Sequence, residues 1–293
     1  MNAGSARFLD AIALEPVDAS IYDVAFEAMP QYVPWPKAYG GDMVAQTVAA
    51  ASATVGDDRS VHSMHSYFLR PVDVGVPVRY EVELLRDGRG YSTRQVRGIQ
   101  HGKPVFTGML SFHTGAASPE FALAMPQVTP PEQLPSSAQV LAGVEGDAAD
   151  YWSSGRSFDM RHVPSPLYLA NDGESTPHVG VWVRAFDALP DDALLHRIAI
   201  AYVCDYTILE PALRAIGTHW SQQGLMTASL DHAMWFHREA RADEWLLYAQ
   251  EAASVGSGRG FNTGRFFDRD GRLIASVAQE GLISVPDPTT AAG

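Results

Sequence analysis

The phrase Gly88-Arg89-Gly90-Tyr91-Ser92-Thr93 returns 170 residues later as Gly258-Arg259-Gly260-Phe261-Asn262-Thr263. After each copy comes a strand-like run, then a two-residue turn signal, then another strand-like run. The turn signals are His101-Gly102 and Asp270-Gly271. A polar and aromatic phrase that recurs at this distance, in the same surroundings, predicts that the chain contains one domain twice.

Each half shows the same predicted order, an apolar helix followed by strands rich in β-branched and aromatic residues. We expect helices over 41–55 and 205–216, and Pro211 should bend or break the second near its middle. The expected strands are 61–69, 78–85, 91–100 and 105–113, then 228–237, 245–254, 261–268 and 273–284.

This order is an α+β pattern, because the elements do not alternate as βαβ units would. A long helix wrapped by a curved antiparallel sheet is the hotdog fold. The repeat therefore favours a tandem (double) hotdog, and two independent α+β domains are the alternative. Residues 117–156, rich in Pro, Ala, Ser and Gly, are predicted to link a first unit over 5–116 to a second over 157–288.

Composition limits the possible functions. Of the 293 residues, 46% are hydrophobic and 19% charged, which is typical of a globular protein. The net charge of −13 argues against a nucleic-acid or anionic-membrane partner. The single cysteine excludes an intrachain disulfide. Residues 1–10 lack a secretory pattern and no run approaches a membrane span, so we expect a cytoplasmic protein.

Several longer motifs carry a resemblance to a known family. They are HSMHSYFLRP at 62–71, GIQHGKPVF at 98–106, LDHAMWFHR at 230–238 and AQEG at 278–281. These runs resemble the acyl-CoA thioesterase II (TesB-type) family, and the likeness extends from about residue 8 to 284. The resemblance implies a double-hotdog hydrolase that cleaves acyl-CoA to a free fatty acid and coenzyme A. It also implies a role in fatty acid metabolism, a homo-oligomer, and neither cofactor nor metal.

The same resemblance implies a catalytic trio. The family has an Asp at the start of the second helix, a Thr or Ser on a strand, and a Gln near the C-terminus. Matched by position, these are Asp205, Ser229 and Gln279. Many members have Thr where this chain has Ser229, and either residue supplies one hydroxyl. Asp42 is a second departure, because the resemblance would more often place Gln there.

The three side chains have the chemistry that thioester hydrolysis needs. Asp205 can take a proton from water, and a position at a helix start would stabilise its carboxylate. Ser229 and Gln279 have the donors and acceptors to hold that water, so Ser229 is expected to orient water and not to attack. Cys204 lacks the partners of a nucleophile and is expected to be a small buried hydrophobe.

The first half lacks the complete set. Asp42 corresponds to Asp205, His62 falls roughly opposite Ser229, and Leu110 falls roughly opposite Gln279. A leucine cannot position water, so we expect the first half to have lost its site and to shape the acyl and coenzyme A channel. Asp42 is kept as a secondary candidate for the site.

Some alternatives stay open. Arg89 and Arg259, in the repeated phrase, are candidates for contacts with coenzyme A phosphates, or turn residues in solvent. The chain is alternatively a non-catalytic acyl-CoA-binding module, or a hotdog enoyl-CoA hydratase or dehydratase. The latter would need a His/Asp or His/Glu pair across the seam between the halves.

Overall fold

The computed structural model describes residues 3–285. Two predictions reach outside the described residues. They are the absence of a secretory pattern, which includes residues 1 and 2, and the end of the second unit at 288. Among residues 3–285, no helix has the length and apolar character to cross a membrane.

The first half consists of two helices and six strands, listed here in chain order: α1 (Ala3–Ala11), β1 (Glu15–Val17), β2 (Val24–Ala28), α2 (Gly40–Ser52), β3 (Ser60–Phe68), β4 (Val78–Asp87), β5 (Tyr91–Gln100) and β6 (Lys103–His113). The connection then forms short helical turns, η1 (Pro131–Gln133), α3 (Ser137–Val140), α4 (Asp147–Asp150) and η2 (Tyr151–Gly155).

The second half continues with β7 (Phe158–Val163), β8 (His178–Ala185), α5 (Ala193–Val203), η3 (Cys204–Tyr206), α6 (Glu210–Ala215), β9 (Met226–Ser229), β10 (Asp231–Phe236), β11 (Leu246–Gly256), β12 (Arg259–Phe267) and β13 (Leu273–Ser284).

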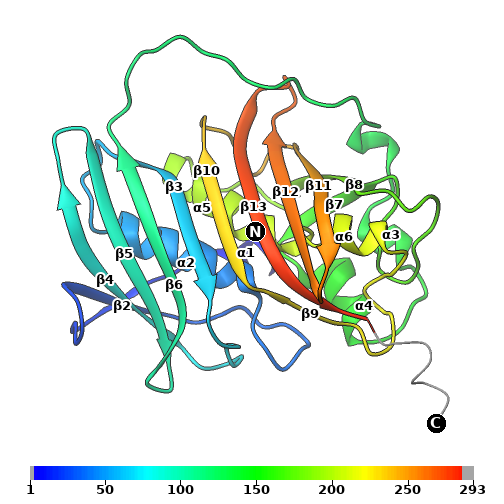
Figure 1. Ribbon diagram of the computed structural model, residues 1–293, viewed down its shortest axis with the longest axis horizontal. Helices are drawn as coiled ribbons and strands as arrows, with labels where there is room; N and C mark the ends of the chain where they lie inside the picture. The colour runs from blue at the N-terminus through cyan, green and yellow to red at the C-terminus, as the bar shows by residue number, and fades with distance from the viewer. Residues whose placement is uncertain (1–2, 286–293) are drawn as a thin grey trace.

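The strands form one antiparallel sheet. Counted inward from its two ends, the strands of the first half and those of the second half follow in the same order. The order is β1-β2-β4-β5-β6-β3-β10-β13-β12-β11-β8-β7, and β9 pairs with β13. The two halves meet where β3 pairs with β10, side by side in the middle of the sheet (Figure 1). Met64 pairs with Met234 at this seam. A duplicated unit produces this symmetric strand order when its two copies join edge to edge. The junction of β3 with β10 removes one exposed strand edge from each copy.

The helices lie together on one side of the sheet, behind it in Figure 1. Every residue of α2 from Gly41 to Ser52 is buried, and α2 packs against both the sheet and α5. Small residues such as Ala49, Ala50 and Ala51 let the sheet curve closely around this helix. A buried helix wrapped by a curved antiparallel sheet, present twice, confirms the predicted tandem hotdog.

The largest error concerns the second helix. Residues 205–216 are not one helix, because Asp205 lies in the 3₁₀ turn η3 that follows α5, and the helix resumes only at Glu210. Pro211 lies in the first turn of α6, where its missing N–H needs no partner, so it begins a helix and does not bend one. The helix α5 was not predicted.

The connection between the halves is packed against the second half. Met125, Val128 and Leu134 contact a separate apolar cluster that includes Trp182 and Trp245. The Trp182 indole also donates to the carbonyl of Thr129 at 2.9 Å. The connection therefore covers the sheet near its β7 end, and it does so through apolar contacts that its Pro-rich composition does not suggest.

Candidate active site

Asp205, Ser229 and Gln279 lie in mutual contact although they are far apart in the sequence. The Ser229 hydroxyl donates to Asp205 Oδ1 at 2.9 Å, and Gln279 Nε2 donates to the same oxygen at 2.7 Å. Gln279 Nε2 also lies 2.9 Å from Ser229 Oγ. The predicted trio is thus a closed triangle of hydrogen bonds with a carboxylate at one corner.

The strand register explains how two of these side chains meet. Ser229 on β9 pairs with Gly281 on β13, so the two residues share a face of the sheet. Gln279 lies two residues before Gly281 and therefore points to the same side. Gly281 leaves room for the turn after Asp205, because a Cβ there would lie 2.6 Å from Leu209 Cδ2.

A helix start does face Asp205, but it belongs to the first half. The backbone N–H of Gly41, in the first turn of α2, donates to the Asp205 carboxylate. Gly40 is so close that a Cβ on it would lie 2.4 Å from Asp205 Oδ2. The first N–H groups of a helix have no partner within the helix and carry its positive end. The expected helix dipole is therefore supplied across the seam, and the site includes both halves.

The surroundings of Asp205 change the acid–base properties of its carboxyl. Enclosure away from water raises the pKa of its carboxyl to about 6, while the hydrogen bonds from Gln279, Ser229 and Gly41 limit the rise. A carboxyl with a pKa of about 6 is ionised at neutral pH and accepts a proton more readily than an ordinary aspartate.

Asp42 does not join this triangle. Its carboxyl is fully buried in α2 and accepts from the backbone N–H of Gln31 at 3.0 Å, while Oδ1 has no hydrogen-bond partner within the described residues. Burial raises the pKa of Asp42 well above its usual value, and the nearby Asp205 adds to this rise. Asp42 therefore lies apart from the triangle, in surroundings that disfavour its charged form.

The register supports one of the correspondences between the halves. Phe68 ends β3 and pairs with Phe106, and Phe236 ends β10 and pairs with Ala275. Leu110 lies four residues after Phe106 and Gln279 four residues after Ala275, so Leu110 corresponds to Gln279, as predicted. The next ladder agrees, because a register shift follows the pair Gly98–Phe106 in the first half and the pair Phe266–Ala275 in the second.

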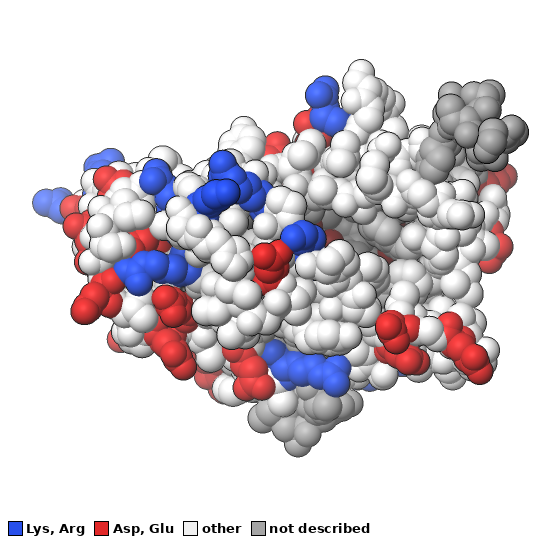
Figure 2. Space-filling view, turned by 90° about the horizontal axis from the view of Figure 1, so that it is seen from below, with Lys and Arg blue, Asp and Glu red and all other residues white. Residues whose placement is uncertain are grey.

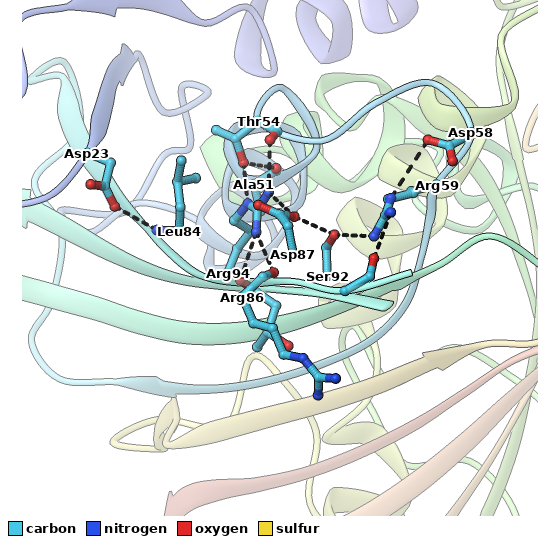
Figure 3. Close-up of polar contacts among 12 residues, drawn as sticks. Asp23, Ala51, Thr54, Asp58, Arg59, Leu84, Arg86, Asp87, Ser92 and Arg94 are labelled. Carbon is cyan, nitrogen blue, oxygen red and sulfur yellow. Dashed lines mark hydrogen bonds and ion pairs between the residues drawn. The ribbon is translucent and has the colours of Figure 1, made fainter. Parts of the chain in front are cut away.

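Two arginines stand out among the polar groups of the first half. Counted from the same strand ends, Arg94 pairs with Leu110 as Asn262 pairs with Gln279, and His62 falls close to the position of Ser229, as predicted. Figure 3 shows the polar contacts of these arginines: Arg94 reaches Thr54 and Asp87, each at 2.8 Å, and Arg59 reaches Ser92 at 2.6 Å. With a leucine in place of Gln279, the described part of this half holds no counterpart of the triangle.

The two arginines of the repeated phrase lie at different places relative to the triangle. Arg259 begins β12 and pairs with Glu280 at 3.1 Å. It lies three residues before Asn262, the β12 partner of Gln279. Arg89 lies exposed in the turn between β4 and β5 of the first half. Among the described residues on the face drawn in Figure 2, acidic and basic side chains are interspersed and form no continuous basic area.

Cys204 and His232 lie behind the triangle. Cys204 is buried, as predicted, and burial raises the pKa of its thiol well above the usual value. His232 Nδ1 lies 2.7 Å from Gln279 Oε1, and its Nε2 lies 3.6 Å from Cys204 Sγ. Sequence reasoning gave His232 no role. No signal in the sequence shows this contact, which depends on the pairing of β10 with β13.

The hotdog pair and the triangle of Asp205, Ser229 and Gln279 are what is expected of a double-hotdog hydrolase. Family models agree with this class. The model described as acyl-CoA thioesterase matches residues 155–282, and the one described as acyl-CoA thioesterase N-terminal domain matches residues 31–113.

Individual proteins agree as well. Acyl-coenzyme A thioesterase 8 of Homo sapiens is 35% identical, covering 93% of this chain and 87% of its own. Acyl-CoA thioesterase 2 of Haemophilus influenzae is 32% identical, covering 93% and 95%. The crystal structure of acyl-CoA thioesterase II TesB2 from Mycobacterium marinum is 35% identical and superposes with a TM-score of 0.76, covering 96% and 98%.

The chain belongs to the acyl-CoA thioesterase II (TesB-type) family. The predicted family is thereby confirmed, and membership makes the chain a thioester hydrolase.

Proposed function

We propose that the chain hydrolyses fatty acyl-CoA to a free fatty acid and coenzyme A with a water molecule activated by Asp205. The observation that carries this proposal is the pair of hydrogen bonds that fix Asp205 Oδ1, from Ser229 at 2.9 Å and Gln279 at 2.7 Å. Ser229 Oγ donates to Asp205 and accepts from Gln279, so one lone pair remains for the water. A water that donates to Asp205 and Ser229 keeps its own lone pair free for the thioester carbon.

Proton and charge balance define the steps. The water oxygen bonds to the carbonyl carbon, its proton passes to Asp205, and the carbonyl oxygen becomes an oxyanion. The first turn of α2, which already faces Asp205 through Gly40 and Gly41, supplies the positive helix end that stabilises this charge. The carbon–sulfur bond then breaks, and the coenzyme A thiolate takes the proton from Asp205. Ser229 forms no covalent bond in this sequence.

The hydratase alternative finds less support. It requires a histidine and a carboxylate that meet across the seam between the halves. The buried His–Glu pair of the described residues is His162 with Glu210, 3.5 Å apart, and both residues belong to the second half. The Glu210 carboxylate also accepts from the Trp220 indole at 3.0 Å, which suits a packed structural pair.

The proposal is tested by following free-thiol release from a panel of saturated acyl-CoAs of increasing chain length. Release of one thiol and one free acid per acyl-CoA consumed supports it. Tight binding of acyl-CoA without thiol release would point to a binding module. Hydration of an enoyl-CoA without thiol release would point to the hydratase.

The pH dependence gives a prediction of its own. Because only ionised Asp205 can accept a proton, kcat/KM is expected to fall about tenfold per pH unit below about 6 and to level off above it. Burial lowers the pKa of His232 to about 4, so its titration does not produce this limb. The measurement is kcat/KM from pH 4.5 to 8.5 on a short acyl-CoA. A profile that stays level down to pH 4.5 would rule out Asp205 as the base.

Further parts of the proposal concern the setting of the reaction. We place the protein in the cytoplasm, in fatty acid metabolism, with units at 5–116 and 157–288 joined by 117–156. Arg89 and Arg259 stay candidates for contacts with coenzyme A phosphates. We also propose a homo-oligomer. Its support is the outer face of the sheet, where the large apolar side chains Tyr67, Met109 and Phe261 are 60%, 49% and 39% exposed.

A further inference from the structure

A buried histidine connects to the triangle from behind. His232 lies on β10 and is 1% exposed. Its Nδ1 lies 2.7 Å from Gln279 Oε1, whereas its contact on the other side, from Nε2 to Cys204 Sγ, is longer at 3.6 Å. The short contact is therefore the one that fixes the state of the imidazole ring.

The tautomer of His232 follows from this contact. A carbonyl oxygen can only accept a hydrogen bond, so the proton of the ring must be on Nδ1. Burial also lowers the pKa of His232 to about 4, and a neutral ring carries a single N–H. Nε2 is then unprotonated and faces the Cys204 thiol, a weak donor.

The orientation of the Gln279 amide follows in turn. An amide can be rotated by half a turn, which exchanges its oxygen and nitrogen. In the rotated state Oε1 would face the Asp205 carboxylate oxygen that Nε2 now approaches at 2.7 Å. The donation to Ser229 would also be lost, and Nε2 would face the Nδ1–H of His232. The observed contacts are consistent in one orientation only.

We propose that His232 is a positioning residue, whose Nδ1–H holds the Gln279 amide in the orientation that donates to Asp205 and Ser229. The inference rests on the proposed role of the trio. His232 acts through Gln279, since its described polar contacts besides Gln279 are with Cys204 and, through its backbone carbonyl, with Ser66.

Two substitutions test separately the hydrogen-bond donor of the His232 ring and the volume that the ring fills. The Nδ2 of an asparagine occupies nearly the place of Nδ1, so His232→Asn keeps the donor, whereas His232→Leu fills the site without one. We expect His232→Leu to lower kcat roughly 10- to 100-fold, the range for removing a buried hydrogen-bond partner, with KM changed less than about 3-fold. We expect His232→Asn to stay within about 5-fold of wild type. Thermal unfolding of both variants checks that they are folded.

A double substitution shows whether the effect passes through Gln279. In a Gln279→Ala background, His232→Leu is expected to lower kcat less than about 2-fold further, because the group it positions is gone. An undiminished effect in that background would overturn the role of His232. Full activity of Gln279→Ala alone would instead overturn the proposed function of the trio, so the two failures differ.

The ring itself offers a readout that needs no substitution. In the wild-type protein, the ¹⁵N chemical shifts of the His232 ring are expected to show a protonated Nδ1 and an unprotonated Nε2 at pH 7. The opposite tautomer, or an asparagine variant that is folded yet as slow as His232→Leu, would overturn the proposal.

Discussion

Asp205→Asn is expected to lower the rate of acyl-CoA hydrolysis at least about 100-fold, within the range for losing a general base. An asparagine has nearly the shape of aspartate, and its side-chain oxygen can still accept from Ser229 and Gln279. The amide cannot take a proton from water, so substrate binding should persist while kcat falls. The measurement is free-thiol release under saturating acyl-CoA, with KM determined in parallel.

A matched control is Cys204→Ala, one residue earlier in the chain. Its thiol is buried, and burial raises the pKa well above the usual value, so it is not a nucleophile at neutral pH. We expect this variant to keep activity within about 2-fold, since its contact with His232 is long at 3.6 Å. Unchanged activity in Asp205→Asn would show that another group activates the water.

Gly40→Ala is expected to produce the second large effect, although Gly40 belongs to the first half. The new Cβ would lie 2.4 Å from Asp205 Oδ2 and 3.1 Å from Phe68 Cε1. The Asp205 carboxylate must then move by roughly 1 Å to reach an ordinary contact distance. A displacement of this size at a reacting group can cost about 100-fold in rate, and we expect kcat/KM to fall by about that factor.

The control for this substitution is Gly90→Ala, where the nearest atom to a new Cβ, Thr114 Oγ1, is 3.9 Å away. This variant should hydrolyse acyl-CoA like the wild type, and the melting temperatures of both variants show whether they fold. Wild-type kcat/KM in Gly40→Ala would mean that the start of α2 does not face the reacting groups.

Much of the fold could be predicted because local patterns decide it. The strands β5 and β13 have the bounds expected from their alternating side chains and turn signals, 91–100 and 273–284. The second helix could not be predicted, because α5, η3 and α6 follow one another as a largely apolar stretch with no clear end signal in the sequence. Packing against α2 and the sheet determines where that stretch breaks, and such contacts are not visible in a local pattern.

Some features of the site could likewise be predicted from the sequence, and others could not. The family resemblance supplied Asp205, Ser229 and Gln279, and the structure brings all three into contact. The helix start beside Asp205 could not be assigned to α2, because it comes from a segment more than 160 residues earlier in the chain. The correspondence of Gln279 with Leu110 was predicted from the sequence, and the strand register supports it. His232 was missed because only a distance shows that it contacts Gln279.

The repeated phrase identifies a duplicated scaffold, and the central claim is that activity resides where the copies differ. Free-thiol release by Asp42→Asn and Asp205→Asn, measured side by side in one assay, tests this claim most directly. Asp42 is buried outside the triangle, and the side-chain oxygen of an asparagine can keep the hydrogen bond from the Gln31 N–H. We expect Asp42→Asn to hydrolyse acyl-CoA at least about 100-fold faster than Asp205→Asn. Equal rates in the two variants, or a slower Asp42→Asn, would contradict a site centred on Asp205.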